Sequence, residues 1–218
     1  RLSTEEDYSA VIYSKEDLII NGNGTLNVNA GYRNGIKSTD DCIIVSGTLN
    51  ITSTEDGIIG KDLCGIVAGD ININAGSDGI KSTYDTDTTK GNVIIEGGNI
   101  TIKASNDGIQ AENILVINDG AINIKTNNGA ADTTQTHIDN MDMGRGGFGF
   151  NNNKTTTTTD DTSESRKGIK AGNMLIINDG DITIDSDDDS VHCNSVIYIY
   201  GGTINAATGD DGVHADDL

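Results

Sequence analysis

The sequence of 218 residues contains no proline, no tryptophan and only two phenylalanines. Without proline, every residue keeps a backbone N–H and remains able to join the hydrogen-bond ladder of a β-sheet. With so few aromatic rings, a core must be filled by aliphatic side chains. No run of about 18 apolar residues occurs, so no membrane-spanning helix is expected.

Basic residues are also scarce, because 14 lysines and arginines face 34 acidic residues and give a net charge of −20. Nucleic acid and anionic membranes are therefore poor partners unless a cation intervenes. The chain begins with Arg1-Leu2-Ser3-Thr4 and shows no charged segment followed by an apolar one. Any secretory signal is thus expected to be absent or already removed.

What the chain does contain is a repeated phrase: an acidic or polar residue, glycine, an aliphatic residue, a basic or polar residue and a small residue. The copies are Asn34-Gly35-Ile36-Lys37-Ser38, Asp56-Gly57-Ile58-Ile59-Gly60, Asp78-Gly79-Ile80-Lys81-Ser82, Asp107-Gly108-Ile109-Gln110-Ala111, Lys167-Gly168-Ile169-Lys170-Ala171, Asp189-Ser190-Val191-His192-Cys193 and Asp211-Gly212-Val213-His214-Ala215. Their common spacing of about 22 residues is typical of a solenoid, in which each repeat buries its apolar face only against its neighbours. Two repeats carry insertions of about 7 and about 38 residues.

Within each repeat, apolar and polar residues alternate with the period of β-strands. One column is entirely isoleucine: Ile44, Ile66, Ile95, Ile117, Ile177 and Ile199. Glycine-containing turn pairs separate the strands. These columns predict an all-β fold, a right-handed parallel β-helix of about eight rungs of about 22 residues with three short strands each.

The helix is expected to form a single domain over residues 1–218, with a low-complexity loop at about 127–166 that is rich in glycine, asparagine and threonine. The last rung is incomplete, so its strand edges are expected to be open to end-to-end assembly with further copies. Cys42 and Cys64 share an inward column on consecutive rungs, at a separation that suits either a disulfide or two buried thiols. Cys193 is expected to be packed and inert.

The acidic residues of the phrase stack along the rod, where like charges about 5 Å apart repel or require a counter-ion. Carboxylates with backbone carbonyls nearby suit Ca²⁺, and the shorter insertion adds two more acids. The predicted calcium ligands are Asp56, Asp78, Asp85, Asp87, Asp107, Asp189 and Asp211. The alternative is that an aspartate before glycine only bonds backbone N–H groups of a repeated turn.

A second column carries basic groups that are predicted to bind ligand: Lys37, Lys81, Lys170, His192 and His214. Beside a calcium ladder these cations would bind the carboxylates of an acidic polysaccharide, or they would only screen the aspartates. The two histidines lie on consecutive rungs and would suit a transition metal, but the sequence reveals no third ligand.

Four phrases occur together in a recognisable order: Asp85-Thr86-Asp87-Thr88-Thr89-Lys90-Gly91-Asn92, Lys167-Gly168-Ile169-Lys170-Ala171-Gly172, Gly201-Gly202-Thr203-Ile204 and Asp211-Gly212-Val213-His214-Ala215-Asp216. They resemble the clostridial carbohydrate-binding β-helix family. The resemblance implies a secreted, right-handed parallel β-helix with the architecture of pectate lyases, which binds calcium, cellulose and acidic sugars without established lyase activity. The chain departs from the pattern at Ile59, Gln110 and Lys167, where the matching site would be altered.

Three functions compete at this point. The first is a calcium-dependent, extracellular or cell-surface protein that binds plant cell-wall polysaccharide, either acidic or cellulosic. The second is a structural fibre built by end-to-end stacking. The third is a polysaccharide lyase, for which Lys81 is the best candidate base although no arginine partner is evident; no catalytic residue is assigned.

Overall fold

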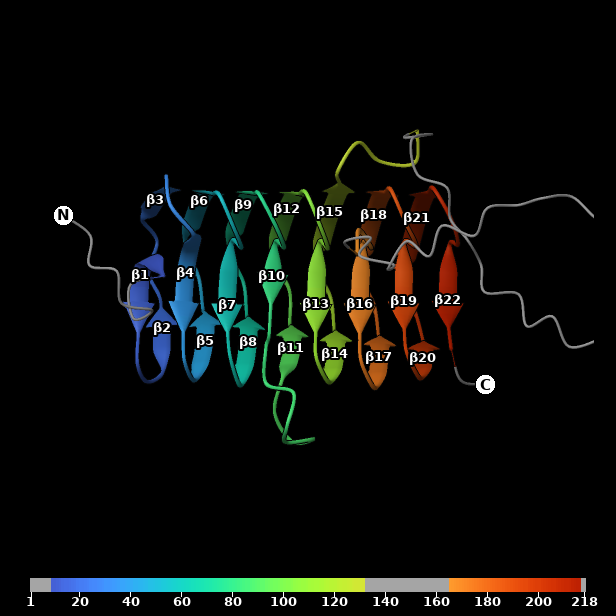
Figure 1. Cartoon of the computed structure of the whole chain (residues 1–218), viewed down its shortest axis with the longest axis horizontal. Coiled ribbons are helices and arrows are strands. Elements are labelled where there is room, and N and C mark those ends of the chain that lie inside the picture. The colour runs from blue at the N-terminus through green and yellow to red at the C-terminus, as the bar shows by residue number, and fades with distance from the viewer. Residues whose placement is uncertain (1–8, 132–164, 217–218) are drawn as a thin grey trace, which may run out of the picture.

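The computed structural model describes residues 9–131 and 165–216, which form the expected parallel β-helix (Figure 1). Each complete rung contributes one short strand to each of three sheets, and all strand pairs within the sheets are parallel. Within the described residues, sheet 1 has eight strands, and sheets 2 and 3 have seven each. No helix in this part of the chain is long and apolar enough to cross a membrane.

The strands of each sheet follow one another along the rod in chain order. Sheet 1 contains β1 (Ala10–Ser14), β4 (Asn34–Ser38), β7 (Ile58–Gly60), β10 (Ile80–Lys81), β13 (Ile109–Ala111), β16 (Ile169–Ala171), β19 (Val191–Cys193) and β22 (Val213–Ala215). Sheet 2 contains β2 (Leu18–Ile20), β5 (Asp41–Ile44), β8 (Leu63–Ile66), β11 (Asn92–Ile95), β14 (Ile114–Ile117), β17 (Met174–Ile177) and β20 (Val196–Ile199). Sheet 3 contains β3 (Thr25–Ala30), β6 (Thr48–Ser53), β9 (Asp70–Ala75), β12 (Asn99–Ala104), β15 (Ala121–Thr126), β18 (Asp181–Ser186) and β21 (Thr203–Thr208).

The core is the set of aliphatic columns expected from the sequence. Ile95 is fully buried, and its register partners in sheet 2 are Ile66 and Ile117. On the outer face of sheet 3, asparagines form their own ladder, in which the Asn72 side-chain amide donates to Oδ1 of Asn50 at 3.1 Å. Burial of branched side chains inside and amide pairing outside therefore reinforce the same register.

The repeated phrase requires glycine because the backbone at this position lies very close to the next rung. An added Cβ at Gly79 would lie 2.4 Å from Cγ2 of Ile102 and 2.5 Å from the carbonyl oxygen of Gly108. Among the seven copies of the phrase, only Ser190 stands where the others have this glycine. In sheet 3 of the same rung, Ala206 occupies the position that Ile184 occupies in the preceding rung. The smaller alanine leaves room for the serine side chain.

The cysteines are free thiols in the described part of the chain, and Cys42 and Cys64 are register partners with no exposed surface. Burial raises the pKa of Cys42 to about 12, so the thiol stays protonated at neutral pH. Cys193 is likewise fully buried. The buried-thiol alternative thus describes this pair, and no disulfide forms between them. Most of the predicted loop at about 127–166 lies outside the described residues.

Candidate functional site

The five predicted ligand-binding side chains form one row on sheet 1, together with Ile59 and Gln110. Register pairs connect Lys37 to Ile59, Ile59 to Lys81, Lys81 to Gln110, Gln110 to Lys170, Lys170 to His192 and His192 to His214. The row results from the parallel register, which repeats each outward position at the same height in the next rung. Its role in ligand binding stays a prediction.

The residues before the glycines form a second row, the acidic row, and in five of them one side-chain oxygen has a structural role. Oδ1 accepts a hydrogen bond from the backbone N–H of the equivalent residue in the following rung. These bonds run from Asp56 to Asn34, from Asp78 to Asp56, from Asp107 to Asp78, from Lys167 to Asp107 and from Asp211 to Asp189, at 2.8–3.1 Å. The repeated geometry explains why asparagine or aspartate suits this position: both provide the side-chain carbonyl oxygen.

The second carboxylate oxygen of this row faces the basic row. Oδ2 of Asp78 lies 2.6 Å from Nζ of Lys81, and Oδ2 of Asp107 lies 3.6 Å from Nζ of Lys170. Burial raises the pKa of Asp78 to about 6, with further contributions from Asp107 and Asp56, although Lys81 opposes the shift. At Asp78 and Asp107, the chain's own ammonium groups thus lie beside carboxylates that were predicted to bind calcium.

Two of the predicted metal ligands lie elsewhere. Asp85 and Asp87 belong to the loop between β10 and β11, which projects from the rod at the end of β10 opposite to Asp78 (Figure 1). Oδ1 of Asp87 accepts hydrogen bonds from the backbone N–H and the hydroxyl of Thr89, at 2.9 and 2.7 Å. The expected cage that combines these acids with the Asp56–Asp78–Asp107 ladder is therefore not assembled, because the strand separates its two halves.

A different acidic cluster lies where the chain turns from sheet 1 into sheet 2. Carboxylate oxygens of Asp17, Asp40 and Asp41 lie within 4.8 Å of one another; these three residues are called the corner cluster below. A hydrogen bond with Asp62, followed by burial and the nearby acids, raises the pKa of Asp40. Burial and the charges of Asp17 and Asp62 raise the pKa of Asp41. This cluster was not predicted from the sequence, although Asp40 and its neighbour Asp62 recur one repeat apart.

A basic and aromatic group adjoins the corner cluster. Lys90 forms an ion pair with Asp62, and its Nζ lies 4.9 Å from the ring centroid of Tyr84. Nζ of Lys61 lies 4.8 Å from the same ring. The shorter insertion carries Tyr84 and Lys90 to this corner, so it adds one ammonium group and an aromatic ring beside Lys61 of the preceding rung. Each ammonium gains a cation–π contact that holds it in place.

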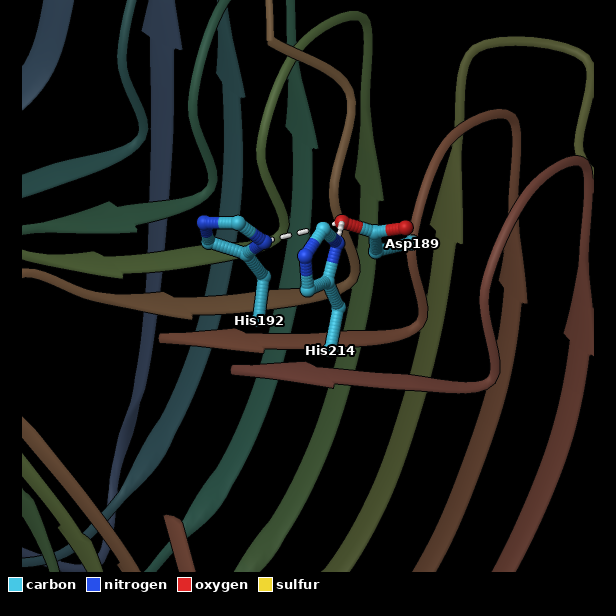
Figure 2. A group of neighbouring side chains, drawn as sticks. All are labelled: Asp189, His192 and His214. Atoms are coloured by element: carbon cyan, nitrogen blue, oxygen red, sulfur yellow. Dashed lines mark hydrogen bonds and ion pairs between the residues drawn. The ribbon is translucent and has the colours of Figure 1, made fainter. Parts of the chain in front are cut away.

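Two histidines and an aspartate meet on the last rungs of sheet 1 (Figure 2). Nδ1 of His192 lies 2.8 Å and Nδ1 of His214 lies 3.4 Å from the same oxygen, Oδ2 of Asp189. Nζ of Lys167 lies 3.0 Å from that oxygen. His192 is buried, whereas the side chain of His214 is 40% exposed. Asp189 thus adds to the two imidazoles a third group able to ligate a metal, which the sequence did not reveal.

Comparison with known proteins identifies the group to which the chain is related. The family model of a carbohydrate-binding domain-containing protein matches residues 1–212. A relative with this description from Acetivibrio thermocellus is 44% identical over 43 residues, which are 20% of this chain and 15% of the relative. The solved structure of a polysaccharide lyase-like protein from C. thermocellum, a gadolinium derivative, is 35% identical and has a TM-score of 0.56.

That structural similarity covers 57% of this chain and 50% of the solved chain, so the present chain spans half or less of the length of these relatives. The family model, in contrast, covers almost the whole chain, and the parallel β-helix agrees with it. The resemblance carried by the repeated phrases is thus confirmed, and the chain belongs to the carbohydrate-binding domain-containing protein family.

Proposed function

We propose that the chain is a secreted, calcium-dependent binder of plant cell-wall polysaccharide, with acidic, pectin-like chains as its preferred ligand. Family membership supports carbohydrate binding, and the polysaccharide lyase-like neighbour supports a polymer as the ligand. The observation that carries the calcium-dependent part is the corner cluster and the two ammonium groups beside it. An extracellular or cell-surface location follows from a ligand that is itself outside the cell.

The corner cluster fits calcium better than the acidic row does. Ca²⁺ takes six to eight oxygen ligands and tolerates irregular geometry, and the cluster offers three carboxylates. The raised pKa values of Asp40 and Asp41 mark carboxylates whose neighbours disfavour ionisation. A divalent cation would relieve that repulsion. When bound, calcium would supply a positive charge that connects protein carboxylates to a sugar carboxylate.

The neighbouring cations suit the same ligand. Lys61 and Lys90, positioned over Tyr84, place two ammonium groups close to the corner cluster. A polyuronate presents carboxylates at regular intervals, so one can bind an ammonium group while the next binds the calcium ion. Lys37 lies in β4, three residues before Asp40, so the strand that leads into the corner cluster also carries one residue of the basic row.

The test is binding of polygalacturonate, measured by calorimetry in calcium and in excess chelator. The double variant Asp40→Asn/Asp41→Asn should lose the calcium-dependent part of binding, and Lys61→Ala should weaken binding in calcium. Asp181→Asn, an exposed acid on sheet 3, is the matched control and should behave as the parent. Equal affinity of the parent in calcium and chelator would discard the calcium bridge, while absence of binding to any cell-wall polysaccharide would discard the function itself.

Lyase activity is assayed in the same samples by release of unsaturated product. Burial lowers the pKa of Lys81, but the charge of Asp78 and its hydrogen bond outweigh burial and raise the pKa overall. The ammonium form therefore persists at neutral pH, and Lys81 is a poor acceptor for the proton next to a uronate carboxylate. Binding without product release is the expected result.

A further inference from the structure

We propose that Asp189, His192 and His214 form a binding site for a divalent transition-metal ion such as Zn²⁺ or Co²⁺, separate from the calcium-dependent carbohydrate site. The group lies on β19 and β22 and the turn before β19, and both imidazoles direct a nitrogen toward the same carboxylate oxygen (Figure 2). Imidazole nitrogen with a single carboxylate is a donor set for zinc and related ions, whereas calcium prefers oxygen alone.

The distances from the Asp189 carboxylate oxygen to the two imidazole nitrogens suit a metal ion in place of the hydrogen-bonding protons. Bonds of about 2.0–2.1 Å hold two ligands about 2.9 Å apart at a right angle and about 3.4 Å apart at a tetrahedral angle. Oδ2 of Asp189 lies 2.8 Å from Nδ1 of His192 and 3.4 Å from Nδ1 of His214. The two rings meet edge to face, with centroids 5.1 Å apart, so they approach the oxygen from different directions.

The outer nitrogen of each histidine has an oxygen partner, as in most metal-binding histidines. Nε2 of His192 lies 3.0 Å from Oδ1 of Asn194, and Nε2 of His214 lies 3.3 Å from Oδ1 of Asp216. A proton on each Nε2 would leave the lone pair of each Nδ1 directed at the site. Oδ1 of Asp189 is fixed by the backbone N–H of Asp211 at 3.1 Å, so the orientation of Oδ2 is set before any ion binds.

The charges around the group favour a cation. Carboxylate oxygens of Asp188, Asp189 and Asp210 lie within 4.8 Å of one another, and Oδ2 of Asp211 lies 3.7 Å from Nδ1 of His214. Lys167 is the competing cation, but its Nζ also lies 2.7 Å from Oδ2 of Asp188. The ammonium group therefore keeps an ion pair when a metal takes its place beside Asp189. The exposed side of His214 leaves coordination positions open to water or an incoming ligand.

The experiment uses the whole chain without an affinity tag, stripped of metal by chelation. Titration with Zn²⁺ by calorimetry and with Co²⁺ by visible absorption should show one strong site per chain. His192→Gln and His214→Gln should each lower the affinity at least tenfold. Asp216→Ala, which removes only the outer partner of a half-exposed histidine, should lower it about 10- to 100-fold and preserve the fold.

His137 is the third histidine of the chain and lies outside the described residues, so His137→Gln is the matched control and should bind as the parent does. Excess Ca²⁺ should not displace Co²⁺, which distinguishes this site from the proposed carbohydrate function. Full affinity in a folded His192→Gln/His214→Gln double variant would overturn the proposal. An equal loss in His137→Gln, or no binding by the parent, would overturn it as well.

Discussion

Replacing Gly79 by alanine adds a single methyl group at the point where two rungs come closest. The new Cβ would lie 2.4 Å from Cγ2 of Ile102, a fully packed side chain of sheet 3, and 2.5 Å from the backbone oxygen of Gly108. Real Cβ atoms essentially never approach other heavy atoms so closely. The methyl group fits only if the rung shifts, and a shift disturbs the hydrogen bond from Gly79 N–H to the Asp107 carbonyl, now 3.0 Å long.

Overpacking a core by one methyl group costs about 1–3 kcal/mol, and a clash with both backbone and side chain belongs at the upper end. Alanine recovers about 0.4–1 kcal/mol by restricting the unfolded chain. The net loss in the free energy of unfolding should be about 2 kcal/mol, which lowers the melting temperature of a chain of this size by about 4–8 °C.

Gly212 is the matched control because it occupies the same phrase position and has no atom within 4 Å of an added Cβ. Gly212→Ala should leave the melting temperature unchanged or raise it slightly. Circular dichroism melts of the parent and both variants provide the measurement. The double variant Gly79→Ala/Ile102→Ala should lose less stability than the sum of its single changes, since removing Ile102 opens space for the methyl group. Equal melting temperatures for the two alanine variants would refute the argument from close approach.

Three further predictions concern the core, the acidic row and the long insertion. Ile95→Asp places a charge between buried isoleucines and should cost more than about 4 kcal/mol, so a cooperative melt near that of the parent would contradict the assigned register. The pKa of Asp78 is raised from 3.8 to about 6. Between pH 3.8 and about pH 6, the folded chain therefore binds more protons than the unfolded chain, and the contribution of Asp78 to the free energy of unfolding falls as the pH rises. Chemical denaturation of the parent and Asp78→Asn should accordingly show the variant gaining relative stability from about pH 4 to pH 7, whereas a constant difference would contradict the shift. Finally, a short linker in place of residues 132–164 should leave the melting temperature nearly unchanged. The hydroxyl of Thr126 already donates a 2.6 Å hydrogen bond to the carbonyl oxygen of Arg166, and the entropy of loop closure depends only weakly on loop length. Loss of folding would show that the segment supports the rod.

The sequence was most informative where one position repeats along the rod. A register fixed at about 22 residues determines which side chains share a column, so the isoleucine core, the pairing of Cys42 with Cys64 and the basic row could all be predicted. Alternation also separates inward from outward positions within each strand. Both rules depend on the repeat alone and require no knowledge of side-chain conformation.

The candidate sites were harder to predict because they lie at turns, where the period-2 rule ends. The sequence placed Asp85 and Asp87 beside Asp78 since they are close along the chain, but the intervening strand carries them to the other corner. Asp189 was identified only as a calcium ligand, because its approach to the histidines depends on how the turn at Ser190 directs the carboxylate. Partners that form across rungs, such as Lys90 with Asp62, likewise depend on loop conformation.

In the acidic row, each backbone N–H donates to a side-chain oxygen of the preceding rung, and this series of hydrogen bonds is interrupted at Lys167. Lys167 donates its backbone N–H to Asp107 but has no side-chain oxygen to accept the next bond, so the N–H of Asp189 bonds Asp188 instead, at 2.9 Å. The backbone ladder continues across this step through Gly168 and Asp189. At this step the Lys167 ammonium group forms ion pairs with Asp188 and Asp189 instead, at 2.7 and 3.0 Å, so one coupling between neighbouring rungs is ionic. Salt screens ion pairs more than it affects the hydrogen bonds of the other steps, so native-state hydrogen exchange in rising salt should open the rod first at the step after Lys167.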